Sequence, residues 1–136
     1  MNKNIIVVGA NQTGLVFAAF ARTAGFDVTV YEAKKQCDVA YDWTDDMVEE
    51  TFEEVGMPLP PKEIYTRKRN WTFVPPEKGV NVLMDLPDDQ LDMAIYRRPF
   101  NAWLLSRAEC AGVKVFYETP VKRAIVENDV VLGAHP

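Results

Sequence analysis

Gly9, Gly14 and Glu32 are the residues of this chain whose types and spacing are best suited to chemistry. The apolar run Ile5–Val8 leads into Gly9, and Gly14 opens a helix-like segment. A second apolar run, Val28–Tyr31, ends at Glu32. A strand, a glycine turn, a helix and a second strand that ends in an acid form the layout of a βαβ dinucleotide-binding unit. The amino end of the helix would bind a pyrophosphate through its N–H groups and dipole, and the acid would accept hydrogen bonds from a ribose hydroxyl.

The glycine turn departs from the usual fingerprint at its centre. The fingerprint is G-x-G-x-x-G, and this chain reads Gly9-Ala10-Asn11-Gln12-Thr13-Gly14. The middle glycine, which brings the backbone close to a pyrophosphate, is replaced by Asn11. Because Asn tolerates unusual backbone angles better than most residues, we expect the turn to form, with Asn11, Gln12 and Thr13 among its cofactor-binding positions. A dinucleotide site is favoured over a βαβ unit that binds no nucleotide.

Composition narrows the classes of function. The 136 residues amount to one domain, and the net charge of −5 argues against nucleic acid as a partner. Cys37 and Cys110 give no disulfide framework, so we expect reduced thiols. Acidic residues gather at positions 49–54 without a nearby His or Cys, and no metal site is predicted there. No apolar stretch has the length to span a membrane, and no leader segment is recognised. We therefore expect a cytoplasmic protein.

Hydrophobic periodicity and turn residues predict alternating helices and strands along the rest of the chain. The expected helices run over 12–24, from Thr44 as N-cap to a stop at Gly56, and from Pro99 to Ala111. Strands are expected over 64–74 and 80–86, in a β-hairpin or a small antiparallel sheet, followed by a turn over 87–92. Further strands are expected over 113–117, 121–126 and 130–132, the last two joined by a tight Asn128-Asp129 turn. The cations Arg67–Arg69 are predicted to lie on a half-exposed strand rather than on a nucleic-acid face.

These elements predict an α/β fold. We expect a Rossmann-like parallel sheet with an antiparallel β excursion inserted between its second and third strands. The domain is expected to span residues 1–136 and to be incomplete, with residues 33–92 supplying the inserted helix and the antiparallel strands. An incomplete sheet would expose apolar faces, so self-association or a completing chain is expected as a partner.

Three blocks of the chain together resemble a known family. The βαβ unit, the block Arg97-Arg98-Pro99-Phe100-Asn101-Ala102-Trp103-Leu104 and the segment GVKVFYETPV resemble, in order and spacing, the N-terminal part of FAD-dependent oxidoreductases in the p-hydroxybenzoate hydroxylase and geranylgeranyl reductase group. The second block is similar to the family's R-x-x-[LF]-x-x-x-L before a helix. The likeness spans nearly the whole chain, but the family's later cofactor motifs, an Asp-Gly pair and a Gly-Asp pair, lie beyond the matched part.

The resemblance implies roles for individual residues. Gly9, Asn11 and Gly14 would form the pyrophosphate turn, and Glu32 would hold the adenosine ribose. Arg97 would approach the phosphate and ribitol region of FAD, where a guanidinium suits an anionic pyrophosphate. Val121 would meet the adenine edge through its backbone. Arg98 is interpreted as a surface residue at the start of a helix.

The implied function is FAD binding for a flavin-dependent oxidoreductase, either a monooxygenase or a reductase, with NAD(P)H as a possible reductant. No residue of this chain is identified as a catalytic acid or base, so we expect it not to be catalytic alone. Two alternatives remain: a non-enzymatic dinucleotide-binding module or remnant, and a small NAD-binding regulator. In the second alternative Glu32 would favour a ribose 2′-hydroxyl over a 2′-phosphate.

Overall fold

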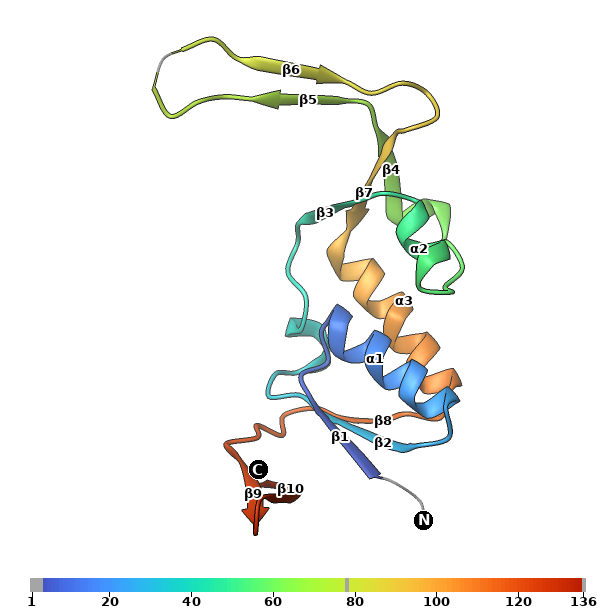
Figure 1. The fold of residues 1–136 in the computed structure, drawn as a ribbon, viewed down its shortest axis with the longest axis vertical. Helices are drawn as coiled ribbons and strands as arrows, with labels where there is room; N and C mark the ends of the chain where they lie inside the picture. Colours follow the sequence, from blue (N-terminus) through green and yellow to red (C-terminus); the bar gives the residue numbers. More distant parts are fainter. Residues whose placement is uncertain (1–3, 78, 136) are drawn as a thin grey trace. The chain divides into compact units, whose positions relative to one another are not determined.

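The computed structural model describes residues 4–77 and 79–135 and divides into two compact units (Figure 1). The first unit joins the residues up to Asp42 with those from Arg98 onward, and the second is Trp43–Arg97. The predicted glycine turn belongs to the first unit, and most of the antiparallel strands belong to the second.

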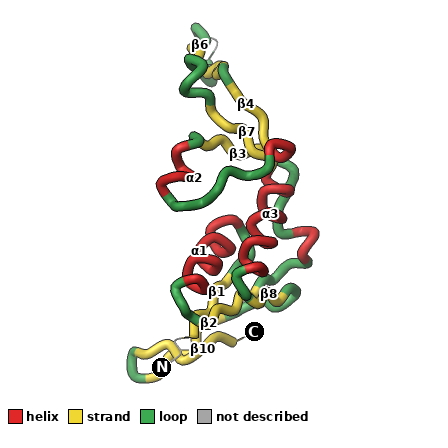
Figure 2. The backbone as a smooth tube through the Cα atoms, turned by 90° about the vertical axis from the view of Figure 1, so that its right-hand side faces the viewer, coloured by secondary structure: helices red, strands yellow, loops and turns green. Residues whose placement is uncertain are grey.

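The first unit is built on a parallel sheet. Its strands are β1 (Asn4–Val8), β2 (Asp27–Tyr31) and β8 (Lys114–Phe116), in the order β1-β2-β8. Helix α1 (Gln12–Thr23) connects β1 to β2, and α3 (Arg97–Cys110) leads to β8. Figures 1 and 2 show both helices on one face of the sheet, as right-handed crossovers that step in one direction require. The predicted parallel Rossmann-like sheet with an excursion between its second and third strands is confirmed.

The core of the first unit lies between this sheet and its two helices. Its apolar side chains are buried in α1 (Leu15, Ala18, Ala21), β2 (Val28, Val30) and α3 (Phe100, Leu104, Leu105, Ala108). Small residues on α1 let the helix lie close to the strands. The register places Ile6, Val8 and Phe116 on the opposite face of the sheet, where all three are exposed.

The second unit contains a three-stranded antiparallel sheet. Its strands are β3 (Thr44–Met47), β7 (Asp92–Tyr96) and β4 (Tyr65–Lys68), in the order β3-β7-β4. The second unit also contains the short helix α2 (Glu50–Glu54) and the 3₁₀ turn η2 (Lys62–Ile64). Another 3₁₀ turn, η1 (Gln36–Asp38), belongs to the first unit. Met93 and Ile95 of the central strand and Phe52 of α2 are buried.

Two hairpins complete the described chain. Strands β5 (Asn70–Phe73) and β6 (Val82–Asp85) pair antiparallel, which confirms the predicted β-hairpin. Strands β9 (Arg123–Glu127) and β10 (Val130–His135) pair across the predicted turn, where Asn128 and Asp129 both have positive φ. Two successive positive φ values are typical of a two-residue hairpin turn.

Two element predictions in the second unit are wrong, and a third differs by one residue. Thr44 does not cap a helix, because Thr44–Met47 forms β3 against β7 and α2 begins only at Glu50. The single strand predicted over 64–74 is two strands in different sheets, β4 and β5. The turn predicted over 87–92 ends early, because Asp92 opens β7, the central strand of the sheet.

None of the helices in the described ranges combines the length and the apolar character that crossing a membrane requires.

Candidate functional site

The outer glycines of the turn are both required by the backbone. Gly9 has φ +101°, a conformation that side chains other than hydrogen strongly disfavour. Its N–H donates to the carbonyl of Tyr31 at 2.8 Å, which ties the end of β1 to β2. A Cβ on Gly14 would lie 2.1 Å from the carbonyl oxygen of Gly9, so the start of α1 touches the end of β1 without room for a side chain. This contact fixes the amino end of α1 directly beside the turn.

Asn11 occupies the central position of the turn as the N-cap of α1. Its backbone is extended (φ −77°, ψ 179°), so the position does not need the unusual angles that glycine allows. Its Oδ1 accepts a hydrogen bond from the N–H of Gly14 at 3.0 Å. Asn is among the best N-cap residues because its side chain satisfies one of the N–H groups that a helix leaves unpaired. The substitution therefore preserves the turn and stabilises the helix start.

Glu32 points back toward the glycine turn from the end of β2. The residue is 8% exposed, and its Oε2 accepts from the N–H of Ala10 at 2.8 Å. Its Oε1 accepts from the N–H of Lys34 at 2.9 Å. The backbone of Glu32 pairs with the chain after β8, since its N–H donates to Phe116 and its carbonyl accepts from Thr119. The carboxylate is thus held at the edge of the sheet where the turn, β2 and the segment after β8 meet.

Asn101 is a polar residue of the same region that sequence reasoning missed. It is 9% exposed within α3, and its Nδ2 donates to the carbonyl of Ala10 at 3.3 Å. The available signal was its position on the buried face of α3, one turn before Leu105. A polar residue on such a face needs a hydrogen-bond partner inside the protein.

A cavity of about 500 Å³ lies beside Asn101 in the first unit. It is lined by residues of the η1 region, α3 and the end of β8: Gln36, Cys37, Ala40, Arg98, Asn101, Ala102, Leu105 and Tyr117. The Nε of Arg98 donates to Asp42 Oδ1 at 2.8 Å, and this hydrogen bond, followed by the charge of Asp42, raises the pKa of Arg98. Burial, with the charges of Glu109 and Glu32, raises the pKa of the Tyr117 phenol.

The two adjacent arginines fall in different units. Arg97, the predicted phosphate ligand, belongs to the second unit and pairs there with Asp45, its Nε donating to Oδ2 at 2.8 Å. Arg98, interpreted from sequence as a surface residue, lies in the same unit as the turn and donates to the carbonyl of Cys37. Of the other predicted positions, Gln12 and Thr13 open α1, and Val121 is half-buried between β8 and β9. The cofactor contacts of Arg97 and Val121 stay predictions.

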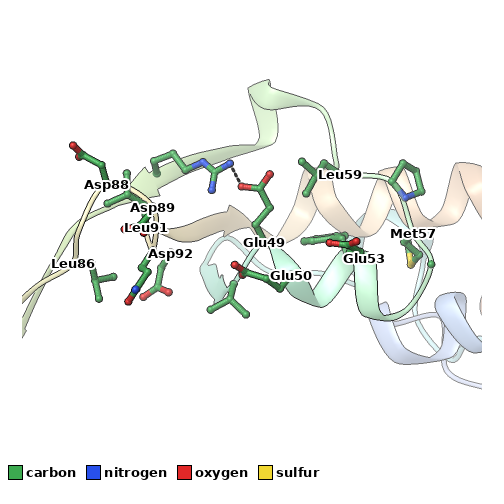
Figure 3. Close-up of a pocket in the computed structure, with 16 residues that line it drawn as sticks. Glu49, Glu50, Glu53, Met57, Leu59, Leu86, Asp88, Asp89, Leu91 and Asp92 are labelled. Carbon is green, nitrogen blue, oxygen red and sulfur yellow. Dashed lines mark hydrogen bonds and ion pairs between the residues drawn. The ribbon is translucent and has the colours of Figure 1, made fainter.

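The second unit contains a separate cavity of about 1370 Å³, shown in Figure 3. Apolar side chains of Phe52, Met57, Leu59, Leu86 and Leu91 line it. Its carboxylates belong to Glu49, Glu50, Glu53, Asp88, Asp89 and Asp92. Arg67 forms an ion pair with Glu49 at this cavity, and Lys68 and Arg69 pair with Asp46 and Asp88. Over residues 4–77 and 79–135, no group of three or more His, Cys, Asp or Glu is arranged to hold a metal ion.

The first unit has the features of a dinucleotide-binding domain of the Rossmann type. A strand delivers the chain to a glycine turn, the turn abuts a helix amino end, and an acid at the end of the second strand faces the turn. Comparison with family models agrees, since residues 7–54 match the NAD(P)-binding Rossmann-like domain. The predicted dinucleotide-binding fold is therefore confirmed.

Curated relatives and solved structures define the resemblance more narrowly. The chain is 29% identical to digeranylgeranylglycerophospholipid reductase 1 of Methanopyrus kandleri and 30% identical to reductase 2 of the same organism. Each match covers 98% of this chain, but only 34% and 32% of the two relatives, so the chain spans about a third of their length. The resemblance to the geranylgeranyl reductase group is confirmed.

Two solved structures show the same fold at low sequence identity. A geranylgeranyl bacteriochlorophyll reductase-like protein of Thermoplasma acidophilum superposes with a TM-score of 0.80 at 17% identity, over 98% of this chain and 35% of that one. The myxobacterial chondrochloren halogenase, an FAD-dependent halogenase, gives 0.72 at 20% identity, over 98% and 32%. Both likenesses support the fold class predicted from the sequence.

Proposed function

We propose that this chain binds FAD with the pyrophosphate at the amino end of α1, and that it is the FAD-binding portion of a flavin-dependent oxidoreductase. The observation that carries the proposal is the convergence of the Gly9–Gly14 turn, the start of α1 and the Glu32 carboxylate. The names of the relatives favour a reductase, and the name of the halogenase favours FAD as the cofactor. NAD(P)H is the reductant we expect for the bound flavin.

The residues present fit an adenine dinucleotide. The contact between Gly14 and Gly9 brings the N–H groups of the first helical turn beside the turn, where backbone amides and the helix dipole favour an anion. Each oxygen of Glu32 accepts one backbone hydrogen bond, and a carboxylate offers about four acceptor positions, so acceptors remain for ribose hydroxyls. Arg97 is proposed to approach the phosphates, as the family resemblance implies, and Arg98 is a further candidate cation from the same unit as the turn. The backbone near Val121 is proposed to meet the adenine.

This chain supplies binding and orientation in the proposed enzyme. FAD, when bound, carries the hydride or oxygen chemistry, and the protein positions it and tunes its surroundings. Because the chain matches about a third of the reductases' length, we propose that catalysis also requires the parts that correspond to the remaining two thirds. Exposed Ile6, Val8 and Phe116 on the uncovered sheet face support contact with a completing segment, a partner chain or a second copy.

The test is a single charge placed at the amino end of α1. Thr13 is exposed in the first turn of α1. In Thr13→Glu, the added carboxylate stabilises the helix by its attraction to the positive end of the dipole, but it repels a pyrophosphate. We expect calorimetry to show at least a tenfold loss of FAD affinity, about 1.4 kcal/mol, with no loss of thermal stability. Thr13→Gln is the neutral comparison of similar size, and FAD should bind the Glu variant at least tenfold more weakly than the Gln variant. Equal FAD affinity of the Glu and Gln variants would place the pyrophosphate elsewhere.

One observation favours a second candidate function. The side chain of Asn11 takes the N–H of Gly14, a group that could otherwise face an anion. A non-enzymatic module that has lost tight nucleotide binding would keep such a self-capped turn. Calorimetry with FAD, NAD and ADP separates the candidates: silence with all three supports the non-enzymatic module, and binding of NAD without FAD supports an NAD-binding regulator.

A further inference from the structure

Among the described residues, the buried polar or charged side chains are Glu32 and Asn101, and both bind the same residue. Ala10 is completely buried. Its N–H donates to Glu32 Oε2 at 2.8 Å, and its carbonyl accepts from Asn101 Nδ2 at 3.3 Å. One partner comes from the end of β2 and the other from α3, so two separate elements hold Ala10 from its two sides.

Ala10 needs these partners because of its place in the turn. It lies between β1 and α1, outside the strand ladder and before the first helical hydrogen bond, which joins the Leu15 N–H to the Asn11 carbonyl. A buried backbone N–H or carbonyl without a partner is strongly unfavourable, so side chains must supply what regular structure does not.

The hydrogen bonds also set the direction of the neighbouring backbone groups. In a trans peptide the carbonyl and the following N–H point in opposite directions. Holding the Ala10 carbonyl toward Asn101 therefore directs the Asn11 N–H away from Asn101. Holding the Ala10 N–H toward Glu32 directs the Gly9 carbonyl away from Glu32, and that carbonyl is the one that faces Gly14.

We propose that Asn101 is a positioning residue for the dinucleotide: by binding the Ala10 carbonyl, it fixes the peptide that presents the Asn11 N–H to the pyrophosphate. This inference rests on the proposed function, because it assigns the fixed peptide to a bound diphosphate. Glu32 also takes part in this arrangement, because its Oε2 accepts from the Ala10 N–H and so fixes the peptide that joins Gly9 to Ala10.

Two variants of Asn101 separate hydrogen bonding from packing. Asn101→Asp keeps the shape but removes the amide donor and turns an acceptor toward the Ala10 carbonyl, while Asn101→Leu removes the donor with a similar volume. Ser106→Ala is the control, because Ser106 lies on the same helix, is exposed and donates its hydroxyl to the carbonyl of Trp103 in the preceding turn. The probe ligand is ADP, which carries both the adenosine and the diphosphate.

We expect both Asn101 variants to weaken ADP binding at least tenfold and to speed amide exchange of Ala10, Gly14 and Leu15 at least tenfold in the free protein. Exchange in β2 should change less than threefold, and the Ser106→Ala protein should match the unmodified one. An Asp variant that binds and exchanges like the unmodified chain would overturn the inference, as would a uniform loss of protection across β2 and α3. If the Leu variant does not fold, the Asp variant decides alone. If the unmodified chain binds no ADP, the proposed function fails, while amide exchange still tests whether Asn101 fixes the turn.

Discussion

The contact between Gly14 and Gly9 allows a stability prediction worked from a distance. In Gly14→Ala, the added Cβ would start 2.1 Å from the Gly9 carbonyl oxygen, whereas real Cβ atoms essentially never lie closer than 3.0 Å. Strand and helix must separate by roughly 0.9 Å, the difference between those two values. The blocking atom belongs to the backbone, so no side chain can rotate away, and the cost falls near the upper end of overpacking, about 3 kcal/mol. Ala is preferred over Gly in a helix by about 1 kcal/mol, which leaves a net loss of about 2 kcal/mol.

Urea denaturation measures this loss. Trp103 is the tryptophan of the first unit, so the experiment uses a background in which Trp43 and Trp71 of the second unit are replaced by Phe. With a urea slope of about 2 kcal/mol/M for a small domain, the midpoint should fall by about 1 M. Gly133→Ala is the control, since its Cβ would lie 3.6 Å from Ile125 in an ordinary contact and should change stability by less than about 0.5 kcal/mol. A Gly14→Ala midpoint equal to that of the control would refute the argument.

Three further perturbations test other parts of the structure. In Glu32→Gln, one backbone N–H would face the new NH₂ group, and urea denaturation should show a loss of about 1–3 kcal/mol. Burial, then the charges of Glu109 and Glu32, raises the pKa of Tyr117, so stability should fall as pH rises from about 10 through the raised pKa, and thermal melts should show a smaller fall in Tyr117→Phe. Met93→Ala removes a fully buried side chain and should cost about 2–5 kcal/mol in urea denaturation, against less than about 0.5 kcal/mol for exposed Leu83→Ala.

Each of these expectations has a contrary result. Equal stability of the Glu32→Gln protein would mean that its carboxylate is not needed by the turn. Parallel pH curves for the Tyr117→Phe and unmodified chains would exclude the phenol as the source of the alkaline loss. A Met93→Ala cost no larger than that of Leu83→Ala would contradict the central place of β7 in the second unit.

The parts of the fold that sequence predicted are those with local chemical signals. Three signals in the sequence predict the turn at Gly9 and Gly14: an apolar strand before it, glycines where the backbone requires them, and an acid at the end of the next strand. The Asn128-Asp129 turn follows from residues that tolerate positive φ. In both places, neighbours in the sequence determine the conformation.

The parts that sequence missed depend on distant partners. Asp45 reads as a helix-start residue, but it lies in β3, which pairs with β7. Its side chain pairs with Arg97, 52 positions later. Asn101 bonds Ala10 across 91 positions. Contacts between such distant residues produce no pattern in the local sequence. The apolar neighbours of Asn101 therefore gave no indication of the backbone group that its side chain would bind.

The junctions of the second unit have a consequence for engineering. On the first unit, Asp42 and Arg98 flank the point where the excursion leaves and returns, and their side chains are hydrogen-bonded. On the second unit, the carbonyl of Trp43 accepts from the N–H of Arg97 at 2.9 Å. If the chain were cut at these junctions, the two new ends of each unit would therefore already lie close together. Closing such a short gap costs little chain entropy. A brief glycine-containing linker from Asp42 to Arg98 would yield a smaller scaffold that keeps the glycine turn, α1 and Glu32, and the excised piece could be grafted into a loop of an unrelated host.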